Sequence, residues 1–389
     1  MSYAIKLKPH ELNLWRTKKP VLGLIDIELT ERCNNNCMHC CINQPEDDTD
    51  ILNREMSTEF VKKILIDAAS LGCLTVRFTG GEPLLRSDFA ELYFFTRRIG
   101  MQVMLLTNAR LITSDIVQLL VKFPPGHTVE VSVYGMKPES YNLVAGHQDA
   151  FDEFKQGIDL LLQYQVPFIV KSPKLHVLKG EQDAFEAWAA TIPSMLSKPG
   201  YSMNFDLRSR RDNPDKNAHI EKIRATPDET VAQLVRNPSY LKDMVQFCSR
   251  FMGVSGDKLF NCGAGLETCI DAYGHAQLCL SLRKKDTVVD LHEVSLKKAL
   301  EEIFPTMREL KATNPDYLRR CAQCFLSGLC DQCPAKSWME YGTLDTPVEY
   351  QCDVAHAKAR HFGLIKENEK AWEVENWKER LKHFEAIHG

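Results

Sequence analysis

Short apolar segments rich in branched residues alternate with amphipathic helical segments over the first half of this 389-residue chain. Between these apolar segments, apolar residues recur at helical spacing, which predicts helices that connect the strands. Ser57 could cap one such helix, which runs to Gly72. Such alternation is typical of parallel strands joined by right-handed crossovers, in an α/β barrel or an open parallel sheet. In both folds the chemistry lies beyond the C-terminal ends of the strands. We predict six strands, at residues 21–30, 74–79, 102–108, 128–135, 167–172 and 201–209.

The chain divides into five segments by its composition. A barrel over residues 21–209 follows a polar leader segment at residues 1–20. Residues 210–252 are charged and punctuated by proline, and we predict a linker that becomes helical. A cysteine-rich module covers residues 253–355, and one amphipathic helix is expected over residues 356–389. Within the module, a hairpin with Gly274 in its turn is predicted between short strands near Ile270 and Cys279.

The bulk composition excludes several classes of protein. With 44% hydrophobic and 26% charged residues the chain is globular, and a formal charge of −4 without a basic arm predicts no nucleic-acid binding. The N-terminus is neither a secretory signal nor a transit peptide, and no apolar run approaches a membrane span. We therefore predict a cytoplasmic protein. In a reducing compartment its 14 cysteines are metal ligands or buried thiols rather than disulfides.

Cys33, Cys37 and Cys40 follow the first predicted strand directly. A structural zinc site needs four ligands, so here Cys41 or His39 would have to join these three thiols. A 4Fe–4S cluster bound by three thiolates would instead leave one iron open, as a reactive cluster requires. Cys41, Cys73 and Cys248 are predicted to be buried thiols rather than ligands.

The spacing CxxxCxxC after the first strand resembles the signature of the radical S-adenosylmethionine (radical SAM) superfamily, as does GGEP at the end of the second strand. The resemblance implies a partial (β/α)6, TIM-like barrel whose 4Fe–4S cluster binds S-adenosylmethionine at its open iron. His39 stands where the family usually has an aromatic residue. An arginine that some members use for the cofactor carboxylate would fall near Val144 and is missing; Lys171 and Arg208 are the candidates for that role. The residues that the resemblance assigns to cofactor binding are His39, Gly80, Gly81, Glu82, Pro83, Thr107, Asn108 and Ser132.

A second concentration of cysteines resembles the SPASM extension of radical SAM enzymes, including Gly274-x4-Cys279 and a CxxCx5C run. Two residues, Asp331 and Gln332, precede the next cysteine, where the family commonly has three. The alternative is one or two zinc ribbons. The resemblance implies two auxiliary 4Fe–4S clusters, which with the first cluster make three. Because eight cysteines can ligate both auxiliary clusters fully, we predict that these clusters transfer electrons rather than bind substrate. The nearer cluster would be held by Cys262, Cys269, Cys279 and Cys333, and the farther by Cys321, Cys324, Cys330 and Cys352.

The resemblance implies reductive cleavage of S-adenosylmethionine to a 5′-deoxyadenosyl radical that abstracts hydrogen from the substrate. The leading hypothesis is modification of a ribosomally synthesised peptide, by a cross-link, a thioether, decarboxylation or a related oxidation. The partners would be that peptide, an external electron donor of the flavodoxin or ferredoxin type, and a separate leader-binding protein. The last is expected because only about 20 residues precede the first strand.

Three other functions are weighed against this hypothesis. Sulfatase maturases have an aspartate after the cysteine that matches Cys279, and here that residue is Leu280. A small-molecule reaction, such as tetrapyrrole modification, shares the same motifs. A non-catalytic iron–sulfur electron carrier would explain neither GGEP nor a three-thiol cluster. No catalytic acid or base is assigned, because strand alternation leaves open which polar residues face the cavity; the candidates are Glu28, Glu130, Tyr134, Asp206 and Arg208.

Overall fold

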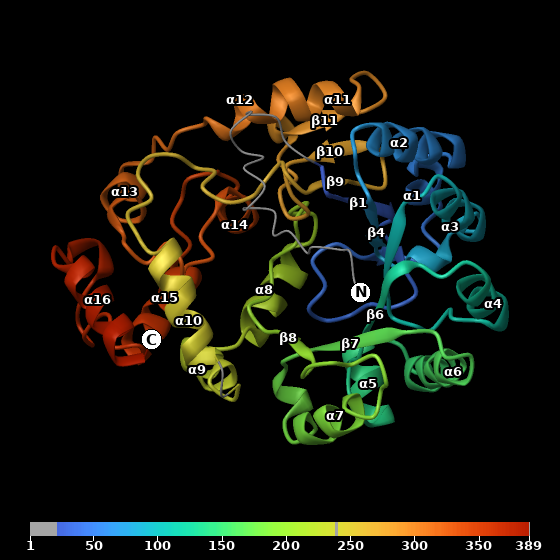
Figure 1. The fold of residues 1–389 in the computed structure, drawn as a ribbon, viewed down its shortest axis with the longest axis horizontal. Helices are drawn as coiled ribbons and strands as arrows, with labels where there is room; N and C mark the ends of the chain where they lie inside the picture. The colour runs from blue at the N-terminus through green and yellow to red at the C-terminus, as the bar shows by residue number, and fades with distance from the viewer. Residues whose placement is uncertain (1–21, 238–239, 389) are drawn as a thin grey trace, which may run out of the picture.

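The computed structural model describes residues 22–237 and 240–388, so the predicted leader segment lies outside the described residues. Its centre is a nine-stranded sheet in the order β11-β10-β9-β1-β4-β5-β6-β7-β8, with a separate two-stranded ladder of β2 and β3 (Figure 1). The strands are β1 (Leu24–Thr30), β2 (Arg32–Cys33), β3 (Gln44–Pro45), β4 (Thr75–Gly80), β5 (Gln102–Thr107), β6 (Gly126–Ser132), β7 (Phe168–Pro173), β8 (Gly200–Ser202), β9 (Thr268–Ile270), β10 (His275–Gln277) and β11 (Val288–Asp290).

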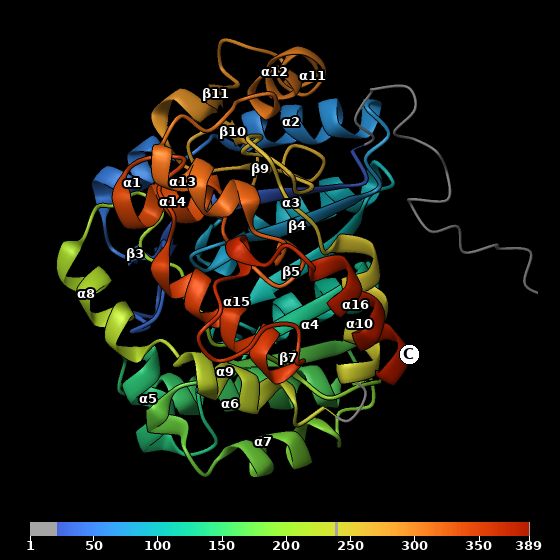
Figure 2. The same cartoon turned by 90° about the vertical axis from the view of Figure 1, so that its left-hand side faces the viewer.

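The six strands β1 and β4 to β8 are all parallel and form a partial barrel, which confirms the predicted fold class. Their connecting helices cover the outer face of the curved sheet (Figures 1 and 2). Ser57 caps α2 as predicted, its Oγ accepting from the Phe60 amide at 3.2 Å, and the helix buries Val61 and Ile64. These helices are α1 (Thr49–Arg54), α2 (Thr58–Ser70), α3 (Phe89–Arg98), α4 (Ser114–Lys122), α5 (Pro138–Ala145), α6 (Ala150–Gln163) and α7 (Gln182–Ala189).

The sixth strand is much shorter than predicted. β8 ends at Ser202, and residues 203–209 continue without strand pairing. Met203, Phe205 and Leu207 are nevertheless buried. The alternation that predicted a long strand therefore records burial against neighbouring segments rather than pairing in a sheet.

The hairpin of the cysteine-rich module is continuous with the barrel sheet. β9 pairs with β1 in parallel, placing Cys269 beside Asp26, and β10 returns antiparallel to β9. Gly274 lies in the turn as predicted, with φ +85°, where an added Cβ would press against His292 and Phe60. The sequence predicts this hairpin but not its pairing with the first strand of the barrel.

Most of the remaining helices lie on the open side of the barrel, whereas α11 and α12 lie beside β11 and α2 (Figures 1 and 2). The single closing helix predicted over residues 356–389 is wrong, because two helices occupy this region. The chain turns at Gly363, φ +70°, and then buries Leu364 and Ile365 in a small second core. Among the described residues no helix is long and apolar enough to span a membrane. The helices are α8 (Pro214–Ile223), α9 (Pro227–Leu234), α10 (Tyr240–Phe251), α11 (Leu296–Lys298), α12 (Phe304–Arg308), α13 (Pro315–Arg319), α14 (Pro334–Tyr341), α15 (Glu349–His361) and α16 (Trp377–His388).

A buried ion network ties the cysteine-rich module to β1. Arg283 donates to Glu28 and, at 2.7 Å, to Glu31, and the side chains of Arg283 and Glu28 are fully buried. Arg210 from the linker pairs with Glu31 at 2.7 Å and with Asp271 at 2.9 Å. Burial raises the pKa of Glu28 to about 7, although the adjacent Arg283 favours its charged form.

Replacing Arg283 with Met should destabilise the protein by about 3–5 kcal/mol, because Glu28 and Glu31 would lose a shared buried cation. Guanidinium unfolding followed by tryptophan fluorescence under anaerobic conditions measures this change. Lys311→Met is the matched control, since Lys311 pairs with Asp257 on the surface and should change stability by less than about 0.5 kcal/mol. Equal effects of the two substitutions would contradict the importance of the buried network.

Candidate cluster and cofactor site

Three thiols, Cys33, Cys37 and Cys40, lie on one loop at the C-terminal end of β1. The backbone amides of Asn36 and Met38 donate to the carbonyl oxygens of Ala145 and Val144, at 2.8 and 3.2 Å. Inside the loop, the amides of Asn35 and Asn43 donate to the sulfurs of Cys33 and Cys40, both at 3.4 Å. The loop is therefore held from outside by the end of α5, while its own amides point at the thiols.

The asparagine run between the first two cysteines is held by Arg110, a residue that the sequence reasoning missed. Arg110 follows β5 and donates to the carbonyl oxygen of Asn34 and, at 2.7 Å, to the side-chain oxygen of Asn35. Glu153 accepts from the same guanidinium at 2.6 Å. The only sequence signal for this role is a basic residue just after a strand end.

Burial and the neighbouring thiols favour the protonated form of Cys33 and Cys37. Burial raises the pKa of Cys33 well above its usual value and that of Cys37 to about 12, and neighbouring cysteines raise both further. The Tyr134 hydroxyl donates to Cys37, and Lys216 of α8 places a cation near the same thiol. Thiols gathered this way suit a cationic metal cluster that displaces their protons. The donor set of three fits a 4Fe–4S cluster with one open iron.

The glycines of GGEP allow the second strand to approach this loop. Beyond the strand ends, the Gly81 amide donates to the Thr30 carbonyl at 2.8 Å, and the Glu82 amide to the Arg32 carbonyl at 2.9 Å. An added Cβ on Gly80 would overlap the Thr30 carbonyl, and one on Gly81 would overlap that of Arg32. The two glycines are therefore required by a backbone contact.

Glu82 is fully buried and is held by three donors. Thr107 Oγ1 donates to it at 2.9 Å, the Asn108 amide at 2.8 Å and the Leu84 amide at 3.2 Å, while Pro83 begins a short 3₁₀ turn. Burial raises the pKa of Glu82 from its ordinary 4.5 to about 7, against the opposing effect of these hydrogen bonds. Thr107 and Asn108 were predicted to line the cofactor. In the structure they bind the carboxylate of Glu82, which is expected to hold the methionyl ammonium of S-adenosylmethionine.

His39 lies in an aromatic pocket. Its ring centroid is 5.0 Å from that of Phe205 and 5.9 Å from that of Tyr134. Burial lowers the pKa of His39 to about 4, so the imidazole is neutral. Its buried Nδ1 has no hydrogen-bond partner in the described part of the chain. A flat, neutral ring with one unused polar atom suits contact with a heterocyclic base.

The two residues suggested for the cofactor carboxylate are engaged elsewhere. Lys171, next to Ser132 at the end of β6, pairs with Glu130. Arg208 forms two 2.8 Å hydrogen bonds to Asp212 and also donates to Asn43. Neither side chain is therefore free for that role as the structure stands, and it stays unassigned.

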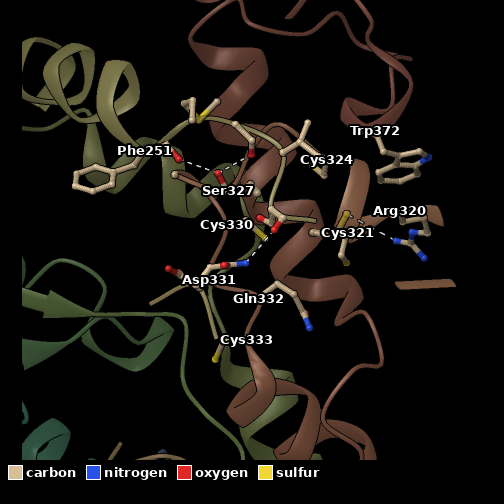
Figure 3. A pocket seen from close by; sticks show the side chains of 18 of the residues that line it. Phe251, Arg320, Cys321, Cys324, Ser327, Cys330, Asp331, Gln332, Cys333 and Trp372 are labelled. Carbon is tan, nitrogen blue, oxygen red and sulfur yellow. Dashed lines mark hydrogen bonds between the residues drawn. The ribbon is translucent and has the colours of Figure 1, made fainter. Parts of the chain in front are cut away.

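The four cysteines predicted for the farther auxiliary cluster share one cavity of about 580 Å³. Figure 3 shows Cys321, Cys324 and Cys330 around this cavity, with Cys333 beyond Asp331 and Gln332. Arg320 donates to the Cys352 sulfur at 3.8 Å and stacks on Trp372 at 4.9 Å. Burial raises the pKa of each of the four thiols, and the neighbouring thiols raise those of Cys321, Cys324 and Cys330 further, so this donor set fits a cluster with four thiolate ligands.

The nearer set is only partly brought together. Cys262 raises the pKa of Cys279, which in turn raises that of Cys333. Cys269 is fully buried in β9, where burial and then the nearby Glu28 raise the pKa of its thiol. That Cys269 is the fourth ligand stays a prediction.

The three thiols predicted to be structural have different environments. Cys73 and Cys248 are buried, as expected, whereas Cys41 is partly exposed beside the cluster loop. Within the described residues, no three His, Cys, Asp or Glu side chains gather as the ligands of one metal ion do. A 4Fe–4S cluster differs from a single metal ion, because each of its thiolate ligands binds a different iron and the thiols therefore lie farther apart.

Residues 27–189 match the model of the Radical SAM superfamily. An Fe-coproporphyrin III synthase of Methanosarcina barkeri is 33% identical over 153 residues, 39% of this chain and 36% of that protein. A PqqA peptide cyclase of Bradyrhizobium diazoefficiens is 34% identical over 124 residues, 32% of each chain. The matches therefore span about a third of the length of these curated relatives.

Solved structures extend the likeness beyond the barrel. SuiB of Streptococcus suis, bound to S-adenosylmethionine, superimposes with a TM-score of 0.59 at 16% identity, covering 89% of this chain and 80% of that one. The anSMEcpe structure with bound AdoMet gives 0.56 at 14% identity, covering 94% of this chain and 99% of that one. At these identities the likeness establishes a shared fold.

Replacing Gly81 with Ala should weaken S-adenosylmethionine binding by about tenfold or more, because the new Cβ pushes Glu82 away from the cluster loop. Equilibrium dialysis with labelled S-adenosylmethionine on the reconstituted protein measures the affinity. Gly200→Ala is the matched control, since nothing lies within 4 Å of its added Cβ. Unchanged affinity in both variants would exclude the proposed backbone contact.

Lowering the pH from about 7.5 to about 6 should weaken S-adenosylmethionine binding by up to about tenfold per unit, because Glu82 gains a proton near pH 7 and loses its charge. The same raised pKa means that its contribution to folding stability is present below pH 4.5 and is lost as the pH rises through about 7. Dialysis at several pH values measures the binding. Glu82→Gln should bind weakly and without this pH dependence; a wild-type slope retained in the variant would assign it to another group.

Proposed function

We propose that this chain, whose residues 27–189 match the model of the Radical SAM superfamily, is a radical SAM enzyme that modifies a ribosomally synthesised peptide. The modification would be a cross-link, a thioether or a related oxidation. The reaction takes place in the cytoplasm, and an external electron donor of the flavodoxin or ferredoxin type supplies electrons. Recognition of a leader sequence would fall to a separate partner protein.

The observation that carries this proposal is the open edge of the barrel. The strand order ends at β8, so β1 and β8 do not close into a cylinder. Beside this edge lies a groove of about 750 Å³, between the segment after β7 and helices α7, α8 and α9. Its walls carry charges of both signs, including Lys174, Lys179, Asp183, Glu229 and Arg236. An extended peptide can enter such a barrel from the side, which a closed barrel would prevent.

Several relatives act on peptides according to their names. SuiB has been solved with its precursor peptide SuiA, at a TM-score of 0.55, and anSMEcpe with a Cp18Cys peptide, at 0.52. A second PqqA peptide cyclase, from Rhodopseudomonas palustris, is 30% identical over 159 residues. These likenesses support a peptide as the substrate class.

In this proposal the chain's own residues bind and orient the reactants. Cys33, Cys37 and Cys40 hold the first cluster, and Glu82 receives the methionyl ammonium. His39 and Phe205 form an apolar wall that excludes water beside them. When bound, the cluster and S-adenosylmethionine together supply the one-electron chemistry that removes a hydrogen atom from a substrate carbon.

A tetrapyrrole is the second candidate substrate, and the sequence relatives favour it. The Fe-coproporphyrin III synthase and an AdoMet-dependent heme synthase of Methanosarcina barkeri are 33% and 32% identical over 153 and 149 residues. These matches cover about two fifths of this chain.

Anaerobic incubation of the reconstituted protein with S-adenosylmethionine, dithionite and the short peptides encoded beside its gene should yield a product lighter by two hydrogen atoms. This loss is expected because a cross-link or thioether replaces two bonds to hydrogen. Mass spectrometry measures the product, and Cys37→Ala, which lacks a thiol of the first cluster, is the inactive control. Parallel incubation with Fe-coproporphyrin III should leave that compound unchanged. Conversion of the tetrapyrrole with no change in any peptide would overturn the proposal.

A further inference from the structure

We infer that the groove of about 750 Å³ between the segment after β7 and helices α7, α8 and α9 binds an extended, acidic segment of the substrate peptide. Lys174 and Lys179 are the side chains that recognise its carboxylates. This inference rests on the proposed function for the identity of the ligand as a peptide, and it adds the charge of the bound segment. The lining comes from residues 174–236 and not from the cluster loop, so the bound segment lies away from the reacting residue.

The groove lies at the C-terminal ends of the last barrel strands. One wall is the segment that follows β7 directly, where the Lys174 amide donates to the Ser202 carbonyl at the end of β8, at 2.7 Å. Lys174 and Gln182 also line a smaller pocket that contains Gly135, just beyond the end of β6. The groove therefore adjoins the end of the barrel at which parallel α/β folds carry their chemistry.

The buried part of the groove lining is apolar and the exposed part is charged. Leu175 and Ala225 are buried, whereas Lys179, Asp183 and Glu229 are exposed. An extended peptide places successive side chains on opposite faces. A segment in which acidic and apolar residues alternate would therefore present one kind of side chain to each part of the lining.

The carboxylates of the groove already have partners within the protein. Asp183 accepts from Arg236 at 2.8 Å. Glu229 shares a 2.8 Å hydrogen bond with His176 Nε2. These two carboxylates therefore repel an acidic ligand less than unpaired carboxylates would, and a basic ligand would have to compete with their present partners.

Lys174 and Lys179 have no carboxylate partner in the described part of the chain. Lys174 donates instead to the neutral side chain of Gln182. The Lys179 side chain is exposed on the other side of the short turn of residues 176–178. Burial lowers the pKa of Lys174, and the neighbouring Arg236 lowers it further. A carboxylate brought by a ligand would offset this unfavourable environment of the ammonium.

A carboxylate is therefore the ligand group that the groove favours. A lysine ammonium is a compact charge with three donors, so it can bind either oxygen of a carboxylate without a fixed geometry. Two such ammonium groups can accept acidic side chains at somewhat different positions along a peptide. Both lysines are accessible to solvent, so the pairing should weaken as the salt concentration rises.

Fluorescence anisotropy with labelled synthetic octapeptides, on the reconstituted full-length protein, tests this selection directly. The probes are four repeats of Glu-Ala, and the same peptide with Gln or with Lys in place of Glu. The Glu peptide should bind at least about tenfold more tightly than the other two, and Lys174→Met should weaken its binding about tenfold. Lys155→Met, the loss of an exposed lysine of α6 outside the groove, is the matched control and should bind as the wild type does. No binding of the Glu peptide, or equal binding of all three peptides, would overturn the inference.

Lys179→Glu is a second variant, because it changes an exposed side chain that the fold does not require. It should weaken binding of the Glu peptide about fivefold, and circular dichroism checks the fold of both variants. Unchanged peptide binding in both folded variants would overturn the inference. Unchanged peptide binding together with lost conversion of Fe-coproporphyrin III would also overturn it, since the lysines would then serve the second candidate substrate.

The anaerobic modification assay separates this inference from the proposed function. Lys174→Met should raise the KM for the modified peptide about tenfold and lower kcat by less than about twofold, because the groove binds a segment away from the reacting residue. A peptide modified with the same KM by both proteins would overturn the inference and leave the proposed function intact. Selective binding of the Glu peptide by a protein that modifies no peptide would instead refute the proposed function alone.

Discussion

The backbone contact between the ends of β1 and β4 is the constraint on which the site depends. Two amide-to-carbonyl hydrogen bonds continue the parallel pairing past both strands, from Gly81 to Thr30 and from Glu82 to Arg32. Because a side chain at either glycine would overlap this backbone, the contact places a buried carboxylate beside the three-thiol loop. The loop is held on its other side by Arg110 and the end of α5. Backbone contacts, together with the buried side chains of Arg110 and Thr107, thus position the cluster ligands and the expected ammonium acceptor.

The second half of the chain is joined to the first by strand pairing and a buried ion pair, in addition to the linker. β9 extends the barrel sheet at β1, and Arg283 is buried against two carboxylates of the same strand end. This arrangement brings Cys279 and Cys333 near Asp206, at the end of the barrel that carries the first cluster loop. The cysteine-rich module therefore lies against the end of the barrel that carries the first cluster loop.

The sequence predicts what local pattern and spacing determine. Strand–helix alternation predicted the parallel strands of an α/β barrel or open sheet, and Gly274 marked the hairpin correctly, because both depend on nearby residues. That the barrel is partial came from the family resemblance. Pairing between distant segments is not encoded locally, and the sequence therefore did not reveal that β9 joins β1 or that Arg110 holds the loop. The register of β9 also places Cys269 beside Asp26, which no local pattern predicts. The predicted long sixth strand was wrong because the buried residues Met203, Phe205 and Leu207 alternate as they would in a strand. The single closing helix was wrong because the chain turns at Gly363.

The central claim is that the β1 loop and Glu82 form one site in which a three-thiol cluster offers its open iron to S-adenosylmethionine. Electron–nuclear double resonance on the reduced, reconstituted protein, with S-adenosylmethionine labelled at its methionyl nitrogen and carboxyl carbon, tests it most directly. A hyperfine coupling from the label to the cluster in the wild type, absent in Cys37→Ala, is the predicted result. A wild-type spectrum with no coupling, or a coupling that survives in the variant, would contradict the claim.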